Sequence, residues 1–142
     1  GIATVTSYFG YVAEVVEVSL NREKRDLKVD RVVCALDCGR PVNPSSLEAQ
    51  VQSSIVYGLT ATLRNSVTIE RGRVQQNNFN DHPVLRIHEM PAVEVHIMPS
   101  ELPPTGAGEF TVPPLAPAIC NAIFAATGRR IRHLPIRPED LA

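Results

Sequence analysis

Hydrophobic positions in the first quarter of the chain follow a two-residue period. Residues 11–20 are rich in β-branched side chains, and four of their apolar residues share one face: Val12, Val16, Val18 and Leu20. Residues 27–36 have the same character and follow the polar run 21–26, which is typical of an exposed turn. The pattern predicts an antiparallel strand pair within a β-rich segment that runs from Ile2 to Leu36.

A helical period begins after a loop rich in glycine and proline. Apolar residues recur at every fourth position, at Leu47, Val51, Ile55, Leu59 and Leu63. Asn43 can cap this helix with a proline in its first turn, or Ser45 and Glu48 can form a capping box. Gln50 and Gln52 cannot both share the apolar side, so at least one glutamine is available to a ligand.

The middle of the chain predicts short β-structure joined by polar turns. Residues 66–70 and 73–76 flank Arg71-Gly72 and indicate a second hairpin. The amide-rich run 75–82 is typical of a solvated turn. Residues 83–87 are expected to form a short edge strand, and the clean alternation over 93–97 predicts another strand.

A second long helix is predicted over residues 113–127, where Leu115, Ile119 and Ile123 face inward and Gly128 ends the helix. A basic, extended tail follows. We therefore expect one domain over residues 1–142, an α+β fold with a mixed or antiparallel sheet and two principal helices.

The composition of the chain narrows the classes of function that the protein can have. An apolar content of 44% and a net charge of −1 describe a soluble globular protein, with no signal for nucleic acid or an anionic membrane. No apolar run approaches the roughly 20 residues of a transmembrane helix. The four histidines and three cysteines show no metal-ligand spacing, so no metal ligand is predicted. The odd cysteine count favours buried thiols in a reducing compartment, and the cytoplasm over the periplasm.

One carboxylate stands out by its surroundings. Glu109 follows Thr-Gly-Ala-Gly and precedes Phe110 and a proline-started helix. The glycines at 106 and 108 permit backbone angles closed to other residues and let a ligand approach the main chain. Apolar neighbours that bury Glu109 would suit it to general-base catalysis. Alternatively, its carboxylate accepts hydrogen bonds at the N-terminus of the following helix, and these residues alone favour that second interpretation.

Four stretches in order carry a resemblance to a known family. They are VDRVVCALDCGRPVNPSSLEAQ (29–50), SSIVYGL (53–59), NNFNDHPVLRIHEMPAVEVHIMPS (77–100) and GAGEFTVPPLAPAICNAIFAATGRRIRHLP (106–135). Together they resemble the C-terminal part of the molybdopterin-binding subunit of molybdenum hydroxylases. The nearest branch is the isoquinoline 1-oxidoreductase β-subunit type, related to aldehyde dehydrogenases and xanthine dehydrogenase.

The resemblance implies a molybdenum–molybdopterin cofactor, in its cytosine dinucleotide form, and hydroxylation of an N-heterocyclic aromatic or oxidation of an aldehyde with oxygen from water. By motif position it implies that Glu109 is the general base, which reverses the structural interpretation above. It maps a cofactor contact onto Gln50 and close backbone approach onto Gly106, Ala107 and Gly108. Electrons would leave through iron–sulfur clusters on a small [2Fe-2S] partner subunit.

The chain also departs from the family pattern. Ser53 and Ser54 stand where the family helix carries glycines, and family subunits are several times longer. The chain is therefore expected to be the C-terminal fragment of a longer subunit, inactive in isolation, with the remainder of that subunit as its partner. The alternatives are a truncated, non-catalytic remnant that acts as a structural or interaction domain, and a free-standing small-molecule binding module.

Overall fold

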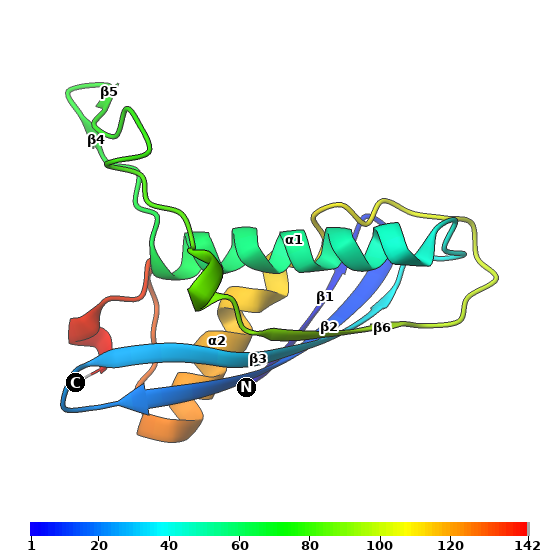
Figure 1. Cartoon of the computed structure of the whole chain (residues 1–142), viewed down its shortest axis with the longest axis horizontal. Coiled ribbons are helices and arrows are strands. Elements are labelled where there is room, and N and C mark those ends of the chain that lie inside the picture. Colours follow the sequence, from blue (N-terminus) through cyan, green and yellow to red (C-terminus); the bar gives the residue numbers. More distant parts are fainter. Residues whose placement is uncertain (142) are drawn as a thin grey trace.

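A four-stranded sheet forms one layer of the fold in the computed structural model, which describes residues 1–141 (Figure 1). Its strands are β1 (Ile2–Ser7), β2 (Gly10–Asn21), β3 (Asp26–Asp37) and β6 (Ala92–Ile97), in the spatial order β1-β2-β3-β6. The first three strands are antiparallel, and β6 runs parallel to β3. The sheet is therefore mixed, and the strand pair expected within residues 11–36 is confirmed.

Two helices form the second layer. α1 (Pro44–Leu63) carries the predicted apolar stripe, and α2 (Val112–Thr127) covers β1 and β2 while packing against α1 (Figure 1). The core between the layers is built mainly from three sets of buried residues: Val12, Val16, Val32 and Leu36 of the sheet, Val51, Ile55 and Leu59 of α1, and Leu115, Ile119 and Ile123 of α2. The α+β fold with two principal helices is confirmed.

The ends of both helices follow their local chemistry. Asn43, and not Ser45, caps α1, because its Oδ1 accepts a 3.1 Å hydrogen bond from the Ser46 backbone N–H. α2 ends at Gly128, which adopts a left-handed φ of 76° and donates its N–H to the carbonyl of Phe124. Glycine is favoured there because it alone has no Cβ to clash in that conformation.

A short arm projects from the two layers. It carries the predicted second hairpin, formed by β4 (Ile69–Glu70) and β5 (Arg73–Val74), and extends beyond the end of α1 (Figure 1). In the following polar turn, Asp81 accepts hydrogen bonds from the backbone N–H groups of Asn77 and Asn78. This arm lies at the opposite end of α1 from the loop that precedes α2 (Figure 1).

The prediction of an edge strand over residues 83–87 is wrong. This segment is irregular and leads into a short 3₁₀ turn, η1 (Ile87–Glu89); a second such turn, η2 (Pro138–Leu141), lies near the end of the chain. In the segment 83–87, two backbone N–H groups donate to side chains and not to a neighbouring strand: Leu85 N–H donates to Thr60 Oγ1, and Arg86 N–H donates to Glu89 Oε2. A polar side chain can compete with a strand for such donors.

The inner face of β2 contains a carboxylic acid that the two-residue period passed over. Glu14 lies between Val12 and Val16, is 0% exposed, and pairs across the sheet with Cys34. Neither of its carboxyl oxygens has a hydrogen-bond partner among residues 1–141. Burial raises the pKa of Glu14 to about 8. Burial, and then the charge of Glu14, raises the pKa of Cys34 to about 12.

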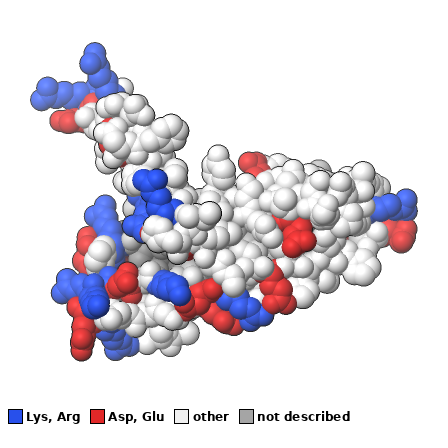
Figure 2. Space-filling view, in the orientation of Figure 1, with Lys and Arg blue, Asp and Glu red and all other residues white. Residues whose placement is uncertain are grey.

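Charged residues are unevenly distributed over the visible face. Figure 2 shows basic and acidic side chains together at the tip of the arm and around the end of the molecule near the C-terminus, while the surface over α1 carries few charges. Within residues 1–141, no helix combines the length and apolarity needed to cross a membrane.

Candidate functional site

The loop between β6 and α2 is held against the loop that enters α1. The backbone N–H of Thr105 donates to the carbonyl of Cys38 at 2.8 Å, and the N–H of Arg40 donates to the carbonyl of Leu102 at 2.9 Å. These bonds hold the segment that follows β6 next to the N-terminal half of α1. They bring residues 106–109 alongside that helix.

Two side chains one turn apart on α1 meet this loop. Ser54 is buried, and its Oγ donates a 2.8 Å hydrogen bond to the carbonyl oxygen of Gly108. Gln50 is exposed, and its Nε2 lies 3.8 Å from the position that a Cβ on Gly108 would take. The spacing of four residues places both side chains on one face of the helix. The predicted cofactor residues Gln50 and Gly108 are therefore neighbours.

The main chain of the loop keeps its donors free. Among residues 1–141, no hydrogen bond is donated by the backbone N–H groups of Gly106, Ala107, Gly108 or Glu109. A Cβ on Gly106 would meet no atom within 4 Å, so that side of the loop is open. Neither Gly106 nor Gly108 has a positive φ, so the loop does not use the left-handed backbone angles that glycine permits. Their contribution is accessible backbone.

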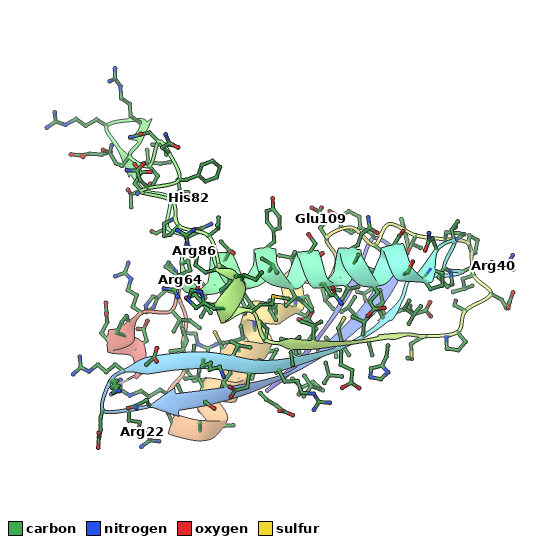
Figure 3. All side chains as sticks on the ribbon, in the orientation of Figure 1. Arg22, Arg40, Arg64, His82, Arg86 and Glu109 are labelled. Carbon is green, nitrogen blue, oxygen red and sulfur yellow. The ribbon has the colours of Figure 1, made fainter. Side chains whose placement is uncertain are left out.

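Glu109 projects from the end of this loop beside α1 (Figure 3). Its side chain is exposed, so the expectation that its neighbours bury it is wrong for this chain; Phe110, not Glu109, enters the core. Nor does the carboxylate cap α2, which begins three residues later. Its Oε1 instead accepts a 2.9 Å hydrogen bond from the hydroxyl of Tyr8.

Glu109 lines a pocket of about 590 Å³ that is open to solvent. Its other walls come from the end of β1 and the following turn, from α1, from the glycine loop and from the start of α2: Ser7, Tyr8, Ser53, Ser54, Tyr57, Ala61, Gly108, Val112 and Pro113. A second hollow of about 250 Å³ borders Gln50 and Ala107. Of the predicted site residues, Gly108 and Glu109 therefore line one hollow and Gln50 and Ala107 line the other.

Sequence reasoning missed two members of this site. Tyr8 lies 101 residues before Glu109, and no local pattern marks it. From the sequence, Ser54 is only a departure from the family pattern, because it adds a side chain where the family helix carries a glycine. In the structure the Ser54 hydroxyl points at the loop and holds it, whereas Ser53 is exposed. Both serines line the pocket. The available signal for Ser54 is its spacing of four residues from Gln50, which puts the two polar side chains on one face of the helix.

Metal-binding side chains do not gather here. No cluster of three or more His, Cys, Asp or Glu that could hold a metal ion occurs in the described part of the chain, residues 1–141. The three cysteines are free thiols, and Cys34 and Cys38 are buried, as expected.

Comparison with known proteins places this geometry in a family. Residues 2–91 match the model of the molybdopterin cofactor-binding domain. The chain is 36% identical over 138 residues to the beta subunit of isoquinoline 1-oxidoreductase from Brevundimonas diminuta, covering 97% of this chain and 18% of that protein. It is also 36% identical over 130 residues to a nicotinate dehydrogenase subunit from Pseudomonas putida, covering 91% of this chain and 11% of that protein.

The solved structures agree on the fold. Quinoline 2-oxidoreductase from Pseudomonas putida 86 superposes with a TM-score of 0.84 at 20% identity, over 93% of this chain and 18% of that chain. The chain thus spans less than a fifth of the length of these relatives. The family model covers well over half of the chain, and a relative with 36% identity aligns with nearly all of it. The chain therefore belongs to the molybdopterin cofactor-binding domain family.

Proposed function

We propose that this chain forms one wall of the active site of a molybdenum-cofactor-dependent hydroxylase and supplies its general base, Glu109. The observation that carries the proposal is the juxtaposition of Glu109 with a loop of free backbone donors beside Gln50, in a chain of the molybdopterin cofactor-binding family. A base at the edge of an open pocket can meet a substrate that enters from solvent.

The residues present fit such a cofactor. Molybdopterin is rich in oxygen and nitrogen, and the unpaired N–H groups of residues 106–109 and the exposed amide of Gln50 offer it hydrogen bonds. The open space beside Gly106 lets the group approach the main chain. When bound, the molybdenum group supplies the redox-active metal that accepts two electrons from the substrate carbon.

The chain's own residues would then divide the remaining work. Glu109 would take up, at its carboxylate, the proton of the water-derived hydroxyl group whose oxygen attacks the substrate carbon. Val112 and Pro113 give the pocket an apolar wall against which a planar ring can rest. Gln50 and the loop backbone orient the cofactor from the α1 side.

Other parts of the assembly belong to the same proposal. The substrate is an N-heterocyclic aromatic or an aldehyde, since isoquinoline and nicotinate appear in the names of two relatives and aldehyde in the names of two others. The chain corresponds to one part of a longer molybdopterin-binding subunit, and the remainder of that subunit completes the pocket. The cofactor takes its cytosine dinucleotide form, and a small [2Fe-2S] subunit carries electrons away.

The test is reconstitution of the complete assembly. The chain is produced together with the remaining subunit sequence and the [2Fe-2S] subunit, and dye-linked oxidation of isoquinoline, nicotinate and an aromatic aldehyde is measured. We expect turnover that Glu109→Gln lowers at least about a hundredfold while molybdenum content stays near one per assembly. Full activity in Glu109→Gln would remove the base assignment. An assembly without molybdenum would instead support the non-catalytic remnant.

A further inference from the structure

The turn between β1 and β2 holds two residues in an unfavourable backbone conformation. Tyr8 and Phe9 have φ values of 49° and 67°, in the left-handed region that glycine and asparagine usually occupy. Neither an aromatic side chain nor an exposed position favours these angles. Such strain persists where the surrounding structure fixes it, and it often marks a functional site.

The turn is fixed to the glutamate loop at two points. The Tyr8 hydroxyl donates to Glu109 Oε1 at 2.9 Å. Two residues later, buried Gly10 lies against the ring of Phe110, so closely that a Cβ on Gly10 would stand 2.4 Å from ring atom Cε2. Because consecutive residues of the loop, 109 and 110, each contact the turn, the turn and the loop keep one relative position.

The two oxygens of the Glu109 carboxylate are not equivalent. Oε1 is occupied by the Tyr8 hydroxyl, whereas Oε2 has no hydrogen-bond partner among residues 1–141. Tyr8 and Glu109 line the same pocket. One oxygen is therefore held by the protein, and the other is left to receive a proton.

We propose that Tyr8 is a positioning residue for Glu109: its phenol fixes Oε1 so that Oε2 meets the substrate side of the pocket. This inference rests on the proposed function, in which Glu109 is the base. When Oε2 takes the proton of the water-derived hydroxyl group that attacks the substrate, the neutral acid keeps its carbonyl oxygen at Oε1. That oxygen still accepts the Tyr8 hydrogen bond, so the arrangement survives the transfer.

Tyr8 is suited to remain a donor throughout. The hydrogen bond to Glu109, together with the nearby carboxylate charge, raises the pKa of the Tyr8 phenol above its ordinary value. The phenol therefore stays protonated across the neutral range. A donor aimed at one carboxylate oxygen restricts rotation of that group, and such orientation contributes to the rate of proton transfer.

Kinetics of the assembled enzyme test the proposal. Tyr8→Phe removes only the hydroxyl, and we expect kcat to fall by roughly tenfold with KM within about twofold of the wild-type value. Tyr11→Phe is the matched control, because Tyr11 belongs to the same hairpin, outside this pocket, and should leave both constants unchanged. A wild-type kcat in Tyr8→Phe overturns the proposal.

A second measurement needs neither cofactor nor turnover. The chain has three tyrosines, and ¹³C-labelled phenol carbons report the titration of each by NMR. We expect the Tyr8 resonance, assigned through Tyr8→Phe, to titrate above the ordinary pKa of a tyrosine phenol, and its midpoint to shift down in Glu109→Gln. An unchanged Tyr8 midpoint in Glu109→Gln shows that the two groups are not joined.

The two proposals fail separately. If Glu109→Gln retains full activity, the proposed function fails whatever Tyr8→Phe does. If Glu109→Gln is inactive while Tyr8→Phe turns over like the wild type, only the role of Tyr8 is lost.

Discussion

Ser54 on α1 and Gly108 in the loop before α2 are joined by a 2.8 Å hydrogen bond from the serine hydroxyl to the glycine carbonyl. The bond spans 54 residues of sequence and fastens the residue that immediately precedes Glu109. It ties the position of the proposed base to the first helix and not only to the helix that follows it.

Removing that hydroxyl should loosen the loop. Ser54→Ala is expected to lower the free energy of unfolding by about 1 kcal/mol, the usual net value of one hydrogen bond. Ser53→Ala is the matched control: it makes the same change one position earlier, on an exposed side chain, and should stay within about 0.5 kcal/mol. Urea unfolding of both variants measures the difference. Equal effects would mean that the Ser54 bond does not stabilise the loop.

Glu14 should make the fold less stable as pH rises. Burial raises its pKa from 4.5 to about 8 in the folded chain, so between these values the folded state holds a proton that the unfolded state has lost. Unfolding then releases that proton, and the free energy of unfolding falls with pH across this window. The full difference amounts to about 5 kcal/mol; this stability is present below pH 4.5 and is lost progressively as pH rises to about 8.

Glu14→Gln isolates this contribution, because glutamine has the same shape and no titration. We expect the wild-type chain to lose stability from pH 5 to pH 8 relative to Glu14→Gln, as measured by denaturant unfolding at each pH. Other titrating groups are shared by the two proteins and cancel in the comparison. A constant difference across the range would show that Glu14 does not titrate there.

The contact between Gly10 and Phe110 predicts a steric effect. Gly10→Ala places a methyl group 2.4 Å from the Phe110 ring, and the resulting overpacking should cost about 1–3 kcal/mol of stability. The change also displaces the turn that carries Tyr8. Thermal unfolding is the direct measurement.

Gly106→Ala is the comparison for that variant, and it carries a prediction of its own. Its new methyl group meets no atom within 4 Å and its φ is not positive, so stability should stay within about 0.5 kcal/mol. In the assembled protein the same methyl occupies space proposed for the cofactor, and molybdenum content should fall. Full molybdenum loading would place the cofactor elsewhere.

Two substitutions distinguish the two capping arrangements considered for the N-terminus of α1. Asn43→Ala removes the acceptor for the Ser46 N–H and should cost about 1 kcal/mol. Glu48→Ala would cost a similar amount only if a capping box existed, and we expect an effect near zero. Far-ultraviolet circular dichroism during urea unfolding follows both. A larger loss in Glu48→Ala would reverse the assignment.

Local patterns determined most of the elements of this protein. The β2–β3 hairpin, both helices and the strand β6 follow from residue periodicity, because a strand or helix must turn its apolar side chains to one face in order to bury them. The segment over residues 83–87 is the exception, since its backbone donors are taken by Thr60 and Glu89, which no local pattern reveals.

The family resemblance also marked Glu109, Gln50 and the glycine loop as candidate site residues, but only the tertiary structure decided how they are held. Tyr8 reaches the loop from the β1–β2 turn and Ser54 reaches it from α1, both across large sequence separations. Glu14 is buried on β2, a strand that α2 contacts. Periodicity reports which residues share a face of one element. It carries no information about which side chain of a distant element will stand opposite, because that depends on how the layers pack.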